Sequence, residues 1–146
     1  VRIPWGILVL FGGGIALALA LEKSNVLQYL AANAEFLDHW SLVFILLIVI
    51  VVSLFATELM SNLALVSVLV PLVAVLAIQM GYTVFQLTIP LTLAASCAFM
   101  MPVSTPPNAI VFSSGKVTIA QMASVGFFLN IIAVLTLWGY CYFFMA

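Results

Sequence analysis

Charged side chains are scarce in this sequence: only 5% of its 146 residues are Asp, Glu, Lys or Arg, whereas a soluble globular domain carries about 25%. So few charges exclude a water-soluble domain, because they leave too little polar surface to cover a folded core. Three basic residues and a formal net charge of −1 also provide no basic patch for nucleic acid and no polybasic stretch for anionic lipid headgroups. We therefore expect the chain to lie in a lipid bilayer.

Metal-binding and nucleophilic side chains are equally rare. Cys97 and Cys141 have neither CxxC nor Cys/His spacing, so we interpret both as buried, small apolar residues. The single histidine, His39, follows Asp38 and precedes Trp40 at the edge of an apolar run, which favours a position at the membrane interface over a metal ligand. No Ser/His/Asp or Cys/His set is available to form a nucleophile with its base. The sequence therefore predicts that the protein is not an enzyme.

Apolar residues, in contrast, make up 67% of the chain and form long uncharged runs. Residues 3–21 are long enough to span a bilayer, and the more polar residues 24–39 predict a short surface helix and a loop. Residues 59–115 carry no charge; as one helix they would extend about 86 Å, against a hydrocarbon core of about 30 Å. This run must fold back on itself, and a final transmembrane helix is predicted over residues 118–146. The predicted fold class is an all-α membrane protein.

Two polar interruptions show where the long run turns. Residues 57–62 separate two apolar segments, each long enough to be a helix. A second interruption lies at residues 101–107, inside a segment predicted to be helical over residues 83–115. Its prolines cannot continue an incoming helix, but a Ser or Thr N-cap followed by proline starts a new one. We therefore predict that one helix breaks near Met101 and that another begins near Pro106.

Single glycines and prolines mark the helices between these interruptions. Gly81 follows an apolar run and is predicted to cap its C-terminal end. Pro71 and Pro90 fall inside predicted helices rather than at polar breaks. Kinks are the expected consequence at both prolines.

The two interruptions also provide chemistry, because each leaves one helix end with unpaired carbonyls and another with unpaired amides. Carbonyl ends favour a cation and amide ends favour an anion, which is the arrangement of discontinuous helices in secondary transporters. Glu58 is the only ionisable residue between His39 and Lys116, and an acid within a membrane is a functional candidate. Alternatively, Glu58 lies at a water interface if the first interruption is a plain loop between two complete spans. The residues alone predict half of an ion-coupled transporter for a small anion.

The residues at the second interruption resemble a known family. The run from Ala95 to Val111, ASCAFMMPVSTPPNAIV, is similar to the sodium-symporter signature of the divalent anion/sodium symporters, or INDY-type dicarboxylate transporters. The similarity extends to residues 5–14, 57–62 and 112–122. It implies a multi-pass protein of the bacterial inner membrane and an inverted-repeat fold that works by an elevator mechanism, with sodium as the co-transported ion. Since the chain begins with Val1, we expect a fragment, the C-terminal half, which joins the N-terminal half of the same transporter and forms a homodimer.

The resemblance also implies a re-entrant helical hairpin over residues 40–80 with its tip at residues 57–63, and it implies roles for individual residues. Asn62 is expected to contact both the substrate and sodium. Leu63 departs from the family pattern, which has Thr at this position, so the substrate stays open: a C4 dicarboxylate such as succinate is expected first, and sulfate or citrate are alternatives. The full set expected at the substrate is Ser61, Asn62, Leu63, Thr105 and Pro106, and the set expected at sodium is Thr57, the Met60 carbonyl, Asn62 and the Ser104 carbonyl.

Two other functions fit a membrane protein of this composition. A sodium-independent anion exchanger of the same fold would need a fixed cation in place of sodium, and neither interruption contains Lys, Arg or His. A structural or channel-forming subunit would leave Glu58 and the polar interruptions without a reason. Both observations favour the sodium-coupled symporter.

Overall fold

The computed structural model describes residues 40–144 continuously, and before them only positions 9, 12, 13, 16, 19, 20, 23 and 24. Three predictions therefore lie outside the described residues, apart from those few positions. They are the transmembrane helix over residues 3–21, the surface helix and loop over residues 24–39, and the interfacial role of His39. Between residues 40 and 144 the only regular elements are helices, without a strand, which confirms the all-α part of the predicted fold class there. The helices are α3 (Leu42–Thr57), α4 (Asn62–Gln79), α5 (Val84–Ala95), α6 (Pro106–Ser113) and α7 (Ile119–Phe144).

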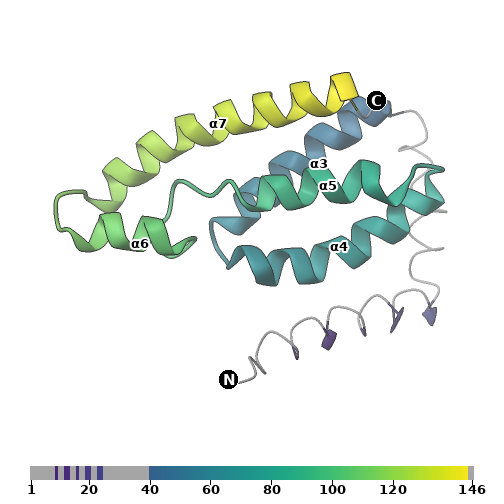
Figure 1. The fold of residues 1–146 in the computed structure, drawn as a ribbon, viewed down its shortest axis with the longest axis horizontal. Coiled ribbons are helices and arrows are strands. Elements are labelled where there is room, and N and C mark those ends of the chain that lie inside the picture. The colour runs from purple at the N-terminus through teal and green to yellow at the C-terminus, as the bar shows by residue number, and fades with distance from the viewer. Residues whose placement is uncertain are drawn as a thin grey trace.

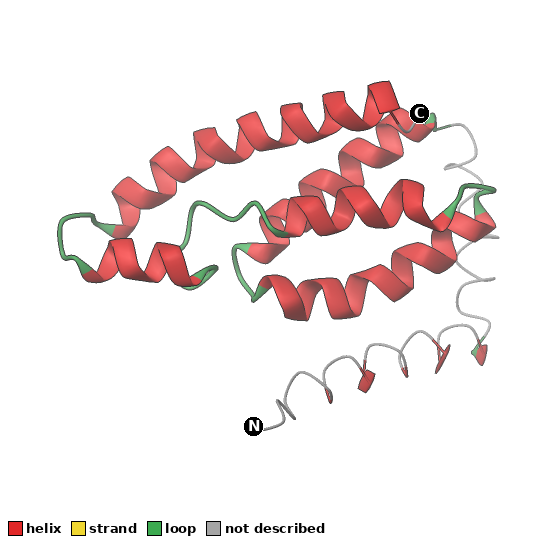
Figure 2. Ribbon diagram, viewed as in Figure 1, coloured by secondary structure: helices red, strands yellow, loops and turns green. Residues whose placement is uncertain are grey.

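The helices pack into a bundle around α5, which lies against both α3 and α4, while α7 runs along α3 and α5 (Figure 1). Completely buried leucines from two elements form the centre of the core: Leu46 and Leu54 on α3 and Leu91 on α5. Cys141 on α7 is also fully buried, as predicted, but Cys97 is only half-buried. Figure 2 shows that α6 follows α5 after a stretch without helix.

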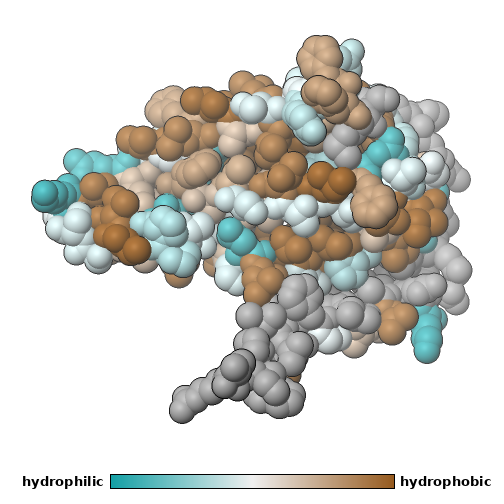
Figure 3. Space-filling model, in the orientation of Figure 1, coloured by the Kyte–Doolittle hydropathy of each residue, from teal (hydrophilic) through white to brown (hydrophobic). Residues whose placement is uncertain are grey.

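The outer surface is largely apolar, as expected for a protein whose solvent is lipid. Phe128, Ile132 and Leu135 on α7 are all well exposed, and Figure 3 shows hydrophobic residues over the body of the molecule with hydrophilic ones gathered where α6 joins α7. Among the described helices, α4 and α7 are long and apolar enough to cross a membrane, whereas α3 and α5 are shorter apolar helices. Apolar patches of this extent are rare on soluble monomers.

Local sequence sets several helix ends. Gly81 has a φ of +74° directly after α4, and this left-handed conformation, which glycine adopts without strain, terminates the helix as predicted. The next helix, α5, starts with a capping box in which the Thr83 N–H donates to the Gln86 side chain at 2.9 Å. Helix α4 continues through Pro71 and α5 through Pro90.

The interruption after α5 begins earlier than predicted. Helix α5 ends at Ala95 and α6 begins at Pro106, so the non-helical segment, here called the break, covers residues 96–105 rather than 101–107. Its end agrees with the prediction, because Thr105 is the N-cap of α6 and proline occupies the first helical position. The prediction of a helix up to Met101 was wrong because tertiary contacts with Glu58, described below, draw the backbone amides of the break away from the helical pattern.

Candidate functional site

The turn between α3 and α4, residues 58–61, lies against the break, although about forty residues separate them in the chain. Hydrogen bonds join the two segments at several points, from the Thr57 side chain to Ala95 and from the Glu58 side chain to residues 99–104. In Figure 1 the turn and the break both lie partway along the length of α7 rather than at an end of the bundle. The two polar interruptions of the sequence are therefore a single site.

Glu58 is the centre of this contact. It is 4% exposed, so other described residues shield it from solvent. No Lys, Arg or His side chain pairs with it in residues 40–144, and hydrogen-bond donors surround it instead. These donors are the N–H groups of Phe99 (2.8 Å), Met100 (3.0 Å) and Met101 (3.0 Å), the Ser104 hydroxyl (2.8 Å) and the Asn130 amide (2.8 Å).

This arrangement explains why α5 stops at Ala95. In an α-helix the N–H groups of residues 99–101 would donate to carbonyls four residues earlier. Here the Glu58 carboxylate accepts all three, and successive amides that converge on one anion form a stable nest without helical geometry. The buried carboxylate and the unwound backbone thus satisfy each other's hydrogen bonds.

The carbonyl groups of the break have their own partner in Asn108, in the first turn of α6. The Asn108 side-chain N–H₂ donates to the carbonyls of Ala98 at 3.0 Å and Met101 at 3.1 Å. Its own backbone N–H donates to the Thr105 hydroxyl oxygen at 3.4 Å. Asn108 therefore holds carbonyl groups of the break while Glu58 holds its amides, a role that was not assigned to Asn108 from the sequence.

Helix α7 supplies two further residues that sequence reasoning missed. Asn130 is fully buried and donates its amide to Glu58. One turn earlier, Gly126 touches the break so closely that an added Cβ would lie 2.4 Å from the Phe99 carbonyl oxygen. Residues four apart share a helix face. One face of α7 therefore contacts both the backbone of the break, through Gly126, and the Glu58 side chain, through Asn130. The available signal was a lone carboxamide in the otherwise apolar run after Val125.

Among the predicted sodium ligands, the structure brings Thr57 and Asn62 together. The Thr57 hydroxyl oxygen lies 2.7 Å from Asn62 Oδ1 and 2.9 Å from the Ala95 carbonyl oxygen. One hydroxyl hydrogen can be donated to only one of these two acceptors at a time. Three oxygen atoms from α3, α4 and the end of α5 therefore converge with too few hydrogens to pair them.

The predicted carbonyl ligands belong to Met60, between Thr57 and Asn62 in the chain, and to Ser104 in the break. Neither carbonyl accepts a hydrogen bond from any of the described residues. The Ser104 hydroxyl, in contrast, is occupied, because it lies 2.9 Å from the Glu58 carbonyl and 2.8 Å from its carboxylate. Ser104 can therefore bind a ligand through its carbonyl oxygen.

The predicted substrate residues cap two helices. Ser61 is the N-cap of α4 and its hydroxyl oxygen accepts the Ala64 N–H at 3.2 Å, while Thr105 plays the same part for α6. Leu63 is 38% exposed and Pro106 is exposed. Within the described residues no hydrogen bond joins Ser61 or Leu63 to Thr105 or Pro106.

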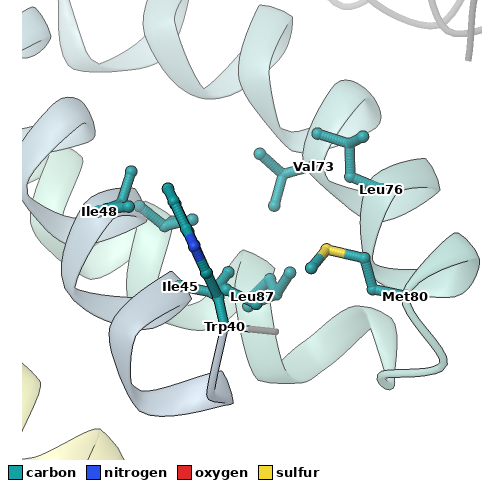
Figure 4. Close-up of a pocket in the computed structure, with 8 residues that line it drawn as sticks. Trp40, Ile45, Ile48, Val73, Leu76, Met80 and Leu87 are labelled. Atoms are coloured by element: carbon teal, nitrogen blue, oxygen red, sulfur yellow. The ribbon is translucent and has the colours of Figure 1, made fainter. Parts of the chain in front are cut away.

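An apolar cavity of about 170 Å³ lies at the other end of the hairpin formed by α3 and α4 (Figure 4). It is far from the turn, because Trp40 precedes α3 and Met80 follows α4. Its lining is wholly apolar, so it offers an anion no hydrogen-bond donor other than the indole of Trp40. The oxygen-rich contact between turn and break is therefore the candidate site.

Comparisons with known proteins identify the family to which the chain is similar. The family described as sodium:sulfate symporter transmembrane region matches residues 1–145. A sodium-dependent dicarboxylate transporter of Staphylococcus saprophyticus is 40% identical over 141 residues, which cover 97% of this chain and 27% of the relative. One from Staphylococcus aureus strain MRSA252 is 41% identical over 144 residues, 99% of this chain and 28% of the relative. The chain thus spans about a quarter of the length of these relatives, whereas the sequence suggested about half.

Proposed function

Because this chain belongs to the sodium:sulfate symporter family, we propose that it supplies the C-terminal repeat of a membrane transporter that carries a C4 dicarboxylate such as succinate together with sodium. The relatives named as sodium-dependent dicarboxylate transporters support this choice of ion and anion. Their staphylococcal origin supports a location in the plasma membrane of a bacterium. The residues of the turn and the break are the proposed binding site.

The observation that carries this proposal is the meeting of the turn with the break. Helices α5 and α6 extend about 18 Å and 12 Å on either side of the break, and α6 ends at the hydrophilic turn that includes Lys116 (Figure 3). In the proposed arrangement these helices form one span with the break inside it, and the α3–α4 turn that contacts the break lies at a similar depth. Irregular backbone at such depth persists only when it is buried in protein or lines a wet cavity. A re-entrant hairpin over residues 40–80 is the corresponding proposal.

The oxygen cluster is the proposed sodium site. Sodium would be held by Thr57, Asn62 and the unpaired carbonyls of Met60 and Ser104, since hard cations prefer oxygen ligands. The Ala95 carbonyl, 2.9 Å from the Thr57 hydroxyl, lies in the same cluster. One hydroxyl hydrogen cannot pair all of these oxygens, whereas a bound cation would contact several of them at once. The cation would thereby hold α3, α4 and the break together.

The N-terminus of α4 is the proposed anion site. The Ser61 hydroxyl accepts a bond from Ala64 but keeps its own hydrogen for an anion, and Asn62 begins the helix whose free amides favour negative charge. Pro106 and Pro107 have no N–H, so the start of α6 offers an apolar wall beside Thr105. Such a wall suits the methylene groups of a dicarboxylate better than the oxygens of sulfate.

Transport requires this site to face both sides of the membrane in turn. The hairpin and the broken span are bonded to each other at the turn and break, which supports an elevator mechanism in which they move as one body within a homodimer. A sodium-independent exchanger is less well supported, because no Lys, Arg or His side chain contacts the turn or the break among residues 40–144. A purely structural subunit would not account for the converging oxygens.

Uptake of radiolabelled succinate by proteoliposomes that contain the full-length transporter tests the proposal. We expect uptake that depends on an inward sodium gradient and is inhibited by unlabelled succinate more strongly than by sulfate or citrate. Equal uptake with and without the gradient would contradict sodium coupling. Stronger inhibition by sulfate than by succinate would instead support the second candidate substrate, which the family description names.

A further inference from the structure

Glu58 has no place in the proposed sodium or substrate contacts, yet it makes more hydrogen bonds than any residue predicted to bind a ligand. All of its acceptor capacity is directed at the protein itself: three amides of the break, the Ser104 hydroxyl and the Asn130 amide. An intramembrane acid without a cationic partner costs free energy unless such donors surround it. The arrangement therefore indicates a specific task for the carboxylate.

The geometry of Asn130 supports this view. Its Nδ2 faces the carboxylate at 2.8 Å, since two acceptor oxygens at that distance would repel each other. Its Oδ1 is left buried without any hydrogen-bond partner among the described residues, which is unfavourable. The contact with Glu58 thus determines the orientation of the Asn130 amide, although this orientation leaves Oδ1 without a hydrogen bond.

We infer that Glu58 is the positioning residue of the sodium site: with Asn130 and Gly126 of α7, it locks the break to the α3–α4 turn, so that ligands on separate elements keep a fixed separation. This inference rests on the proposed function. Glu58 itself bridges the two ligand groups, because it follows Thr57 directly in the chain and its carboxylate accepts the Met101 N–H and the Ser104 hydroxyl of the break. Helix α7 contributes no sodium ligand but sets where the break can lie.

The side-chain chemistry makes Glu58→Gln a sharp perturbation. Glutamine has the same length, but its N–H₂ would replace an oxygen that accepts at least one backbone N–H of residues 99–101. A backbone N–H can only donate, so part of the contact is lost with little change in volume. Second-layer partners of metal ligands typically contribute roughly 10- to 100-fold to metal affinity. We expect Glu58→Gln to raise, by a factor in this range, the sodium concentration that gives half of the maximal rise in melting temperature.

The two cysteines provide a readout that does not depend on transport. Cys97 lies in the break and is half-buried, whereas Cys141 on α7 is fully buried away from it. We expect N-ethylmaleimide to label Cys97 several-fold faster in Glu58→Gln than in the unmodified full-length protein, with Cys141 unchanged, as quantified by peptide mass spectrometry. Unchanged Cys97 labelling, or equal acceleration at both cysteines, would overturn the lock.

Asn130→Asp gives a second test, because it places a carboxyl group 2.8 Å from Glu58. When protonated, the new group can donate to Glu58 and replace the amide; when both groups ionise they repel each other. The other groups that contact Glu58 are backbone amides and one hydroxyl, which do not titrate near neutral pH. Sodium dependence in Asn130→Asp should therefore approach that of the unmodified protein at acidic pH and weaken as pH rises, whereas Asn130→Leu should be weak throughout.

Sodium dependence is measured as the rise in melting temperature of the purified full-length protein with sodium compared with choline. Thr136→Val is a matched control on α7, since within residues 40–144 the Thr136 hydroxyl bonds only to Ile132 of its own helix. If Glu58→Gln frees Cys97 but leaves sodium dependence unchanged, the positioning role is wrong. If the unmodified protein shows no sodium effect, the proposed function fails, and Cys97 labelling still decides whether Glu58 locks the break.

Discussion

Replacement of Gly126 by alanine tests how closely α7 must approach the break. A Cβ at this position would lie 2.4 Å from the Phe99 carbonyl oxygen and 2.6 Å from Met100 Cα. Ordinary van der Waals contact begins at 3.4 Å, so α7 or the break must retreat by about 1 Å. The groups in the way are backbone atoms, which cannot change rotamer to avoid the methyl group.

The size of the effect follows from what holds the break in place. The Phe99 and Met100 N–H groups bond to Glu58 at 2.8 and 3.0 Å, and a shift of about 1 Å takes such bonds beyond useful length. Overpacking of a close contact costs about 1–3 kcal/mol. If the cost falls on the sodium-competent arrangement, it corresponds to a loss in sodium affinity of roughly 5- to 150-fold.

Gly139→Ala is the matched control, because Gly139 lies on the same helix and a Cβ there meets nothing within 4 Å. The assay compares the melting temperature and the half-maximal sodium concentration for succinate uptake of both full-length variants. We expect Gly126→Ala to have a lower melting temperature and a higher half-maximal sodium concentration than the unmodified protein. Gly139→Ala should match the unmodified protein or be slightly more stable, since alanine favours helix. Indistinguishable behaviour of the two variants would refute the reasoning.

Three substitutions test the individual ligands in the same proteoliposome assay. Thr57→Val removes the hydroxyl at similar shape and should raise the half-maximal sodium concentration roughly 10-fold or more, because one polar contact to an ion contributes about 1.5–3 kcal/mol; an unchanged value would remove Thr57 from the site. Asn62→Ala should weaken both sodium and succinate, and a loss confined to succinate would contradict its shared role. Leu63→Thr adds a hydroxyl near the start of α4 and should change the order in which succinate, sulfate and citrate compete; the same order would show that Leu63 points away from the anion.

Local chemistry in the sequence was enough to place several helix ends. Gly81 ends α4 and Thr105 with Pro106 starts α6, because a left-handed glycine and an N-cap followed by proline act through their immediate neighbours. The lipid environment also followed from composition alone. The assigned ligand residues came from motif resemblance, and their roles stay proposals for the substitutions above to test.

The sequence by itself determined that this is an all-helical chain for a bilayer with two polar interruptions, because hydrophobicity, proline and capping residues act over a few neighbours. The family resemblance implied that the two interruptions share a site, and only the tertiary structure showed the contacts by which they meet. It showed that α5 stops at Ala95, since an acid from a distant turn captures the next amides, and that Asn130 and Gly126 of α7 complete the contact. No local pattern encodes these partners, because each becomes meaningful only when folding brings the other beside it.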